Sequence, residues 1–389
     1  MSPAIYLDYQ ATTPVDPRVL EAMLPYFSER FANPASVQHD AGRSAAEAVE
    51  HAREQIAGLL GADRREVVFC SGATEANNLA LKGLAEDAER RHLVVLATEH
   101  HAVLDTAHSL ARRGFEITEL PVDSEGQPSL SALEEAIDEN TLLVSIAAAN
   151  NEIGTLPPLA AVADIAHARG ALLHTDAAQA AGKVDLDLKR DGIDLLSLSS
   201  HKMYGPKGVG ALVVAREHQR PLSPLIHGGG HERGLRSGTL NVPGIVGFGV
   251  AANLTMAEGG EEAERLRALA TRFYEGLRVE IGEVELNGPI EPRLPGNVNL
   301  RFLGIDVEAL MANCPELCFS AGSACSAATP TPSHVLRAIG LSQDGAEQSA
   351  RFGFGRPTSA AEVDRAIEVL ASAVSRIRGA ADKQPIGVR

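Results

Sequence analysis

Hydrophobic positions recur with two different periods along the first two thirds of the chain. Helical spacing of apolar residues occurs at 42–60, 74–86, 103–113, 130–138 and 159–169, and short apolar runs typical of strands occur at 66–70, 92–98, 115–120, 141–150, 171–177, 193–200 and 209–215. Strands that alternate with helices predict parallel pairing and a sheet covered by helices on both faces. This part of the chain is therefore expected to form an α/β domain.

The pattern changes near residue 242. A long helical region at 242–277 is followed by shorter strands at 284–287, 296–302 and 351–355, and by helices at 307–312, 334–339 and 360–377. These elements predict a smaller α+β domain. The expected organisation is a large domain over 16–241, a small C-terminal domain over 242–389, and an N-terminal segment, 1–15, that packs with the small domain.

Composition narrows the class of protein. The 389 residues carry a formal net charge of -16, and an acidic surface repels phosphate backbones, so no nucleic acid partner is expected. No apolar run approaches the roughly 18 residues of a membrane span, so no membrane partner is expected either. The 4 cysteines do not suggest a disulfide scaffold, and the first residues lack a signal-peptide pattern. A soluble, cytoplasmic protein is the resulting prediction.

Two polar motifs follow predicted strands and suggest a cofactor. Asp176 ends one apolar run, and Lys202 follows another with Ser199 and His201 just before it. Pyridoxal phosphate requires these groups: a lysine amine for a Schiff base, a carboxylate at the pyridine nitrogen, and donors for the phosphate. Taken singly, Asp176 is as well explained as a helix N-cap, and Lys202 as a solvated loop lysine.

Three further motifs fit the same cofactor. The sequence Ser71-Gly72-Ala73-Thr74 opens a predicted helix, whose N-terminus would attract an anion, although helix capping explains it equally well. His100 follows a strand where an imidazole could stack on the cofactor ring. Asn151 follows another strand and could bond the ring hydroxyl or a substrate carboxylate. A satisfied loop or core group remains the alternative for each.

These motifs resemble one family in order and over nearly the whole chain. The matching pieces include YLDYQATTP, SGATEANN, TEHHAVLDT, NNEIGT, HTDAAQAAGK, SSHKMYGPKG, HGGGHERGLRSGT, AGSACSAATPTPSHVLRAIG and RFGFGR. The chain is similar to the pyridoxal-phosphate-dependent cysteine desulfurases of the NifS-like and IscS-like type, in the form with the longer SGSAC loop. The resemblance implies an aminotransferase-like transferase fold of type I, with a large mostly parallel sheet domain and a smaller α+β domain.

The resemblance also implies residue roles. Lys202 corresponds to the Schiff-base lysine, Asp176 and Gln179 to the partners of the ring nitrogen and hydroxyl, and His100 to the stacking histidine. Ala73, Thr74, Ser199 and His201 correspond to phosphate ligands. Thr239 corresponds to a further phosphate ligand supplied by the neighbouring subunit, which implies a homodimer. Asn151 and Arg351 correspond to the clamp for the substrate carboxylate.

Cys325 corresponds to the nucleophile that accepts sulfur. The implied reaction converts L-cysteine to L-alanine and leaves a persulfide on Cys325, for transfer to an acceptor such as an iron–sulfur scaffold or a thio-modification protein. We expect Cys325 on an accessible loop near the mouth of the cofactor cavity. The C-x3-C pair Cys314 and Cys318 is a weak metal pattern, and no metal is expected.

Two alternatives stay open at this point. Another pyridoxal-phosphate lyase or aminotransferase of the same fold would not need Cys325. A non-enzymatic acidic scaffold would need neither Asp176 nor Lys202, so the presence of both argues against it.

Overall fold

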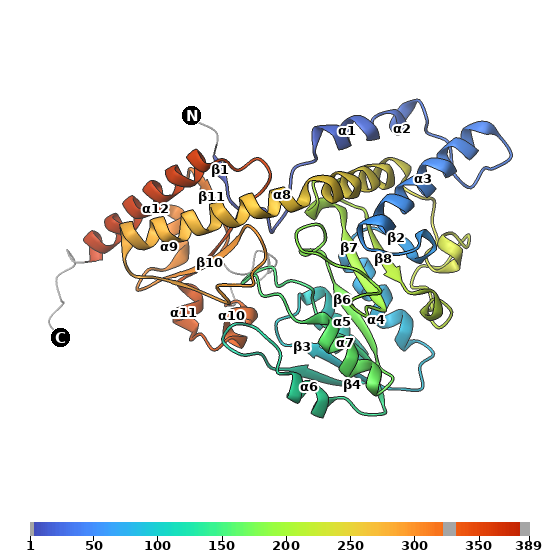
Figure 1. The fold of residues 1–389 in the computed structure, drawn as a ribbon, viewed down its shortest axis with the longest axis horizontal. Coiled ribbons are helices and arrows are strands. Elements are labelled where there is room, and N and C mark those ends of the chain that lie inside the picture. Colours follow the sequence, from blue (N-terminus) through green and yellow to red (C-terminus); the bar gives the residue numbers. More distant parts are fainter. Residues whose placement is uncertain (1–3, 322–331, 382–389) are drawn as a thin grey trace.

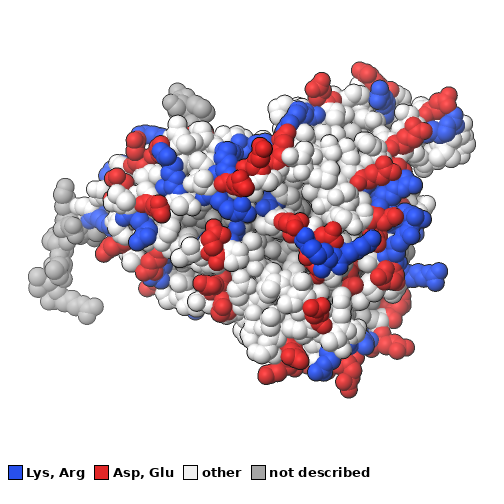
Figure 2. Space-filling model, viewed as in Figure 1, with Lys and Arg blue, Asp and Glu red and all other residues white. Residues whose placement is uncertain are grey.

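The structure is a computed structural model that describes residues 4–321 and 332–381. A larger lobe and a smaller lobe are joined by one long helix (Figure 1). On the face drawn in Figure 2, acidic and basic side chains are interspersed over both lobes. The net negative charge is therefore not gathered into one acidic patch on that face.

The larger lobe is built on a seven-stranded sheet with the order β2-β8-β7-β6-β5-β3-β4. Its strands are β2 (Val67–Cys70), β3 (His92–Leu96), β4 (Glu116–Leu120), β5 (Thr141–Ser145), β6 (Leu172–Asp176), β7 (Leu195–Ser199) and β8 (Gly210–Val214). Neighbours from β7 to β4 pair in parallel, as the sequence predicts, but β8 runs antiparallel to both β7 and β2. Only residues 200–209 join β7 to β8, which is too short for a crossover helix.

Helices cover both faces of this sheet. They are α3 (Asp40–Leu59), α4 (Ala73–Ala85), α5 (His101–Ala111), α6 (Leu130–Ala136) and α7 (Leu159–Ala168). Val94 and Leu96 join a core that includes α3 and α7, whereas Leu93 and Val95 join the core beneath α4 and α5. Since both faces of β3 are buried, its sequence is a continuous apolar run without strand alternation.

Helix α8 (Val242–Ile281) begins in the larger lobe and ends in the smaller one (Figure 1). The smaller lobe has a three-stranded antiparallel sheet of order β12-β10-β9, formed by β9 (Val284–Leu286), β10 (Asn297–Phe302) and β12 (Ser349–Gly353). Its helices are α9 (Val307–Ala312), α10 (His334–Ala338), α11 (Gln343–Glu347) and α12 (Ala360–Ala381). Phe273, Phe302 and Phe352 lie in its core.

The N-terminal segment connects the lobes. Strand β1 (Ile5–Tyr6) pairs with β11 (Leu317–Cys318), and the Thr13 N–H then donates to the His201 carbonyl at 3.1 Å. Short helices α1 (Pro17–Met23) and α2 (Pro25–Ser28) follow, and Val19 and Met23 pack near α8. The 3₁₀ turns are η1 (Arg64–Glu66), η2 (Ser200–Lys202), η3 (Arg216–His218) and η4 (Glu232–Gly234). Within the described chain, no helix has the length and apolar character needed to cross a bilayer.

Candidate functional site

A cavity of about 620 Å³ lies at the carboxyl edge of the larger sheet. Its walls come from residues that follow β2, β3, β5, β6 and β7, from the N-terminal segment and from β12. This is the edge at which open α/β sheets bind ligands, and the volume suits a small molecule of cofactor size.

Ten of the residues predicted from the sequence line this one cavity: Ala73, Thr74, His100, Asn151, Asp176, Gln179, Ser199, His201, Lys202 and Arg351. Thr239 is exposed and is not among the described residues that line it. Cys325 lies outside the described residues. The predicted convergence of strand ends is therefore observed, while the role of each residue stays a prediction.

Lys202 lies on η2, directly after β7. Its amine donates to the backbone carbonyl of Gln10 and, at 2.9 Å, to that of Ala11. Gln179 donates to the same Gln10 carbonyl at 2.9 Å. The N-terminal segment therefore forms part of the wall around the lysine.

Asp176 is the last residue of β6 and is buried. Its carboxylate accepts from Asn77 Nδ2 at 2.7 Å and from the Ala178 N–H at 2.9 Å. Sequence analysis missed Asn77. The signal was present, because Asn77 is one helical turn after Ala73 and so shares the helix face that meets the cavity.

Two buried side-chain oxygens lie near this carboxylate. Asn77 Oδ1 and Gln179 Oε1 have no hydrogen-bond partner in the described part of the chain. Buried polar atoms are rarely left unpaired, so these oxygens indicate that the cavity is built to receive a hydrogen-bonding ligand.

The first turn of α4 faces the cavity at the end of β2. Among the described residues no side chain caps this 13-residue helix, and Ala73 and Thr74 line the cavity. Its first N–H groups and the helix dipole therefore favour an anion. The first residue of the neighbouring strand β8 must be a glycine, because a Cβ at Gly210 would lie 2.6 Å from the Cα of Gly72.

The two histidines of the cavity are held in neutral forms. Burial lowers the pKa of His100, and Lys202 adds to this effect while Asp176 opposes it. His100 Nδ1 accepts from the Ala102 N–H at 3.0 Å, so the proton of the neutral ring lies on Nε2. Burial and the neighbouring lysines lower the pKa of His201 to about 4. His201 can therefore bond an anion near neutral pH, but as a neutral imidazole.

Arg351 lies on β12 and is only 2% exposed. Its Nη2 donates to Asp8 Oδ1 at 2.8 Å and to Ser320 Oγ at 3.3 Å, and its Nη1 lies 3.4 Å from the Asn151 carbonyl. Arg351 is therefore not a surface residue, although its partner Asp8 keeps 16% of its side chain exposed. Asp8 was missed because its contact with Arg351 is set by the tertiary fold alone.

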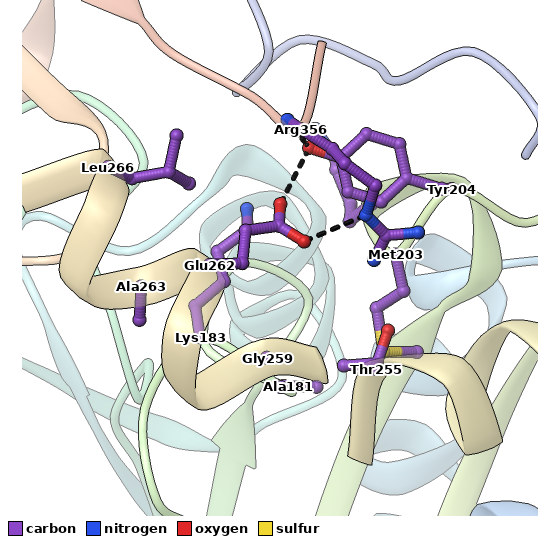
Figure 3. Close-up of a pocket in the computed structure, with 12 residues that line it drawn as sticks. Ala181, Lys183, Met203, Tyr204, Thr255, Gly259, Glu262, Ala263, Leu266 and Arg356 are labelled. Atoms are coloured by element: carbon purple, nitrogen blue, oxygen red, sulfur yellow. Dashed lines mark hydrogen bonds and ion pairs between the residues drawn. The ribbon is translucent and has the colours of Figure 1, made fainter. Parts of the chain in front are cut away.

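A much smaller pocket is also lined by Lys202, and Figure 3 shows the side chains of its other walls. There Glu262 accepts from the Tyr204 hydroxyl at 3.0 Å and from Arg356 Nε at 2.8 Å. Burial lowers the pKa of Lys183 to about 8, against the attraction of Glu262. With about 10 Å³ of free space, it has room for about one water and none for a substrate. This network connects α8 to the segment after η2.

No group of three or more His, Cys, Asp or Glu side chains within 4–321 and 332–381 is arranged to hold a metal ion. Cys314 is buried after α9, and Cys318 belongs to β11, so they form no metal cluster in this region.

Comparisons with known proteins agree with this architecture. The Aminotransferase class-V family profile matches residues 5–366. A protein named "Cysteine desulfurase IscS" from Anaeromyxobacter sp. (strain Fw109-5) is 51% identical, over 96% of this chain and 93% of its own. A protein of the same name from Rickettsia akari is 46% identical over 96% and 92%.

Two solved structures show the same fold. A "NifS-like protein" superposes with a TM-score of 0.89 at 37% identity, covering 96% of this chain and 100% of its own. DndA from Streptomyces lividans gives a TM-score of 0.77 at 42% identity, covering 88% and 97%. The predicted fold class and the resemblance to NifS-like and IscS-like proteins are confirmed.

His174 lies within the larger sheet, two residues before Asp176. Its ring lies between Ser145 Oγ at 2.7 Å and Ser197 Oγ at 3.0 Å, so it connects β6 to both neighbouring strands. The side chain is fully buried, and burial lowers its pKa to about 4, with Asp176 opposing.

This histidine should make folding stability sensitive to acid. In the unfolded chain it gains a proton near its ordinary pKa of 6.5, whereas in the folded protein it stays neutral down to about 4. Between these values the unfolded state binds more protons, so stability falls as the pH is lowered. We expect a loss of about 2 kcal/mol between pH 7 and pH 5 from this group.

Denaturant unfolding at the two pH values measures this effect. His174→Asn should shrink the loss, while His51→Asn, on an exposed position of α3, should retain it. An equal loss in wild type and His174→Asn would contradict the assignment.

Proposed function

Because the chain belongs to the aminotransferase class-V family, we propose that it is a pyridoxal-phosphate-dependent cysteine desulfurase that converts L-cysteine to L-alanine. The observation that carries the proposal is the placement of Lys202, Asp176 and Arg351 in one cavity. The family uses pyridoxal phosphate, which agrees with the expected cofactor.

The residues present fit this cofactor. Lys202 provides the amine that would hold the aldehyde carbon, and Asp176 the carboxylate for a protonated ring nitrogen. The orphaned oxygens of Asn77 and Gln179 would find partners on the ring side. The uncapped α4 N-terminus would receive the phosphate, together with Ser199 and His201. His100 would stack on the ring. When bound, the cofactor supplies an electron sink for the substrate's Cα.

Arg351 and Asn151 would hold the substrate carboxylate. A guanidinium can bind a carboxylate with two parallel hydrogen bonds, and Arg351 Nε has no partner among the described residues. The existing bond to Asp8 uses Nη2 and fixes the plane of the guanidinium. Substrate would therefore bind to an arginine that is already oriented.

Lys202 and Cys325 would perform the chemistry on the substrate. The Lys202 amine would move the Cα proton of cysteine. The Cys325 thiolate attacks the substrate sulfur, the C–S bond breaks, and its electron pair returns to the substrate, which is protonated to give alanine. The accepted sulfur stays on Cys325 as a persulfide, so no external oxidant or reductant is required.

The residues that flank the Cys325 segment support this role. Ser320 Oγ accepts from Arg351 at 3.3 Å, and His334 Nε2 bonds the Glu99 carbonyl, next to His100, at 2.9 Å. Both described ends of the segment therefore lie beside the cavity. The persulfide would pass to an acceptor protein in the cytoplasm, such as an iron–sulfur scaffold or a thio-modification protein.

A homodimer is part of the proposal, with Thr239 reaching the phosphate site of the neighbouring subunit. Large apolar side chains are exposed on and after α1 and α2, where Leu24 is 55%, Phe27 63% and Phe31 75% exposed. Leu225 and Ile226, just before the loop that ends at Thr239, are also exposed. Apolar surface of this extent is typical of an interface.

The reaction is tested with wild type, Lys202→Ala and Cys325→Ala, each incubated with L-cysteine, pyridoxal phosphate and a reductant. Wild type should release sulfide and alanine in equal amounts. Lys202→Ala should bind no cofactor covalently and give no turnover. Cys325→Ala should bind the cofactor normally, with sulfide release at least a hundredfold lower, since the loss of a nucleophile removes the sulfur-accepting step.

The same measurements separate the alternatives. Normal turnover by Cys325→Ala would favour a different lyase or an aminotransferase. A wild type that takes up no cofactor would favour a non-enzymatic protein.

The dimer is tested with Phe31→Glu, since a charge in an apolar interface weakens association. Light scattering should show a larger monomer fraction, and cofactor affinity should fall with it. Val279→Glu is the matched control, because Val279 is 82% exposed on α8 in the smaller lobe. Equal masses for Phe31→Glu and the control at all concentrations would exclude this surface from the interface.

A further inference from the structure

Glu232 is buried at the free edge of the larger sheet. Strand β2 is the edge strand, and the Glu232 carboxylate accepts from its Phe69 N–H at 2.8 Å. The same carboxylate forms a two-bond ion pair with Arg53, with both N–O distances at 2.8 Å. Arg53 also donates to the Val67 carbonyl at 2.8 Å. The Arg53–Glu232 ion pair therefore bonds backbone groups of β2 that would otherwise pair with a further strand.

The backbone at this point is strained. Glu232 and Arg233 both have positive φ angles, 49° and 59°, followed by Gly234 at 87°. A left-handed conformation costs about 1–2 kcal/mol for each residue with a Cβ, and such strain persists only where surrounding contacts impose it. Two contacts with β2 hold this turn: the buried pair, whose Arg53 and Glu232 side chains are only 4% and 2% exposed, and the bond from Arg233 Nη2 to the Val67 carbonyl at 2.8 Å.

The strained turn belongs to a loop, residues 226–238, that is held by hydrogen bonds between its own residues. The Ser237 N–H donates to the Ile226 carbonyl at 3.1 Å, and the Gly230 N–H donates to Ser237 Oγ at 3.2 Å. The Gly238 N–H lies 3.3 Å from His231 Nδ1. Thr239 follows immediately and is exposed. Glu232 therefore holds the loop of residues 226–238 in place, and the conformation of this loop sets the position of Thr239.

We propose that Glu232, held by Arg53, is a positioning residue that presents Thr239 to the cofactor phosphate of the neighbouring subunit. The inference rests on the proposed function, because it requires the cofactor and the shared dimer. Glu232 itself touches neither the cofactor nor the substrate of its own chain's cavity, since it does not line that cavity. Its effect is transmitted through the loop.

The loop also has a contact that could act within its own chain. Arg236 Nε donates to Glu75 Oε1 at 2.8 Å, and Glu75 Oε2 accepts from the Ser71 N–H at 2.7 Å, at the start of α4. A disturbed loop could therefore weaken the phosphate site of the same subunit instead. The experiment must distinguish the two subunits.

Glu232→Gln keeps an acceptor for the Phe69 N–H but removes the charge that holds Arg53. The affinity of the apo dimer for pyridoxal phosphate should fall about tenfold, the loss typical of one charged hydrogen bond. The affinity for pyridoxal, which lacks the phosphate, should be unchanged. Glu50→Gln is the matched control: Glu50 pairs with the same Arg53 at 3.0 Å but lies on α3 and not on the loop, so both affinities should remain normal.

Mixed dimers locate the effect. The absorbance of lysine-linked cofactor reports only the cavity of a subunit that retains Lys202. In the first dimer, Lys202→Ala is paired with Glu232→Gln, so the reporting cavity receives Thr239 from a loop with intact Glu232. In the second, wild type is paired with the double variant Lys202→Ala, Glu232→Gln, so the reporting cavity receives Thr239 from the altered loop. We expect normal affinity in the first and a tenfold loss in the second.

The reverse result, a loss in the first dimer and none in the second, would overturn the proposal in favour of the Arg236–Glu75 contact. Equal loss in both, or equal loss for pyridoxal and pyridoxal phosphate, would reduce Glu232 to a general role in stability. Failure of the proposed function is a separate outcome, since wild type would then take up no cofactor or form no dimer.

Discussion

The ion pair between the buried Arg351 and the partly buried Asp8 joins the parts of the molecule that make the site. A guanidinium removed from water is stable only when its N–H groups are bonded, and losing a partner of a buried pair costs several kcal/mol. Arg351 meets part of this demand with Asp8 from the N-terminal segment, Ser320 from the smaller lobe and a long contact to Asn151 of the larger lobe, while its Nε has no partner among the described residues. The charge needed for a substrate carboxylate therefore also holds three segments together.

The remainder of the cavity shows how burial sets charge. Glu99, fully buried beneath His100, has its pKa raised to about 8 by burial, so it carries a proton near neutral pH. His174 and His201 are kept neutral by the same cause. Burial therefore removes the charge from these three side chains near neutral pH.

Much of the fold and many residues of the cavity were predictable from the sequence, because the order of strands and helices determines which strand ends lie together. Parallel strands end at one edge, so Asp176 and Lys202 had to meet once the strands were recognised. The direction of β8 was not predictable from alternation alone, because it depends on the length of the connection after Lys202. Asn77 was missed although its helix face was known. Asp8 had no local signal, since 343 residues separate it from its partner in the chain.

Helix α8 has a consequence for how the protein loses its structure. Its first half supplies Phe248 and Ala252 to the core of the larger lobe, and its second half supplies Phe273 and Leu277 to the core of the smaller one. At about 1.5 Å per residue its 40 residues extend roughly 60 Å without a break. Melting either core frays the helix on which the other is packed. We therefore expect the two lobes to unfold in one cooperative transition, although each has its own sheet and its own hydrophobic core.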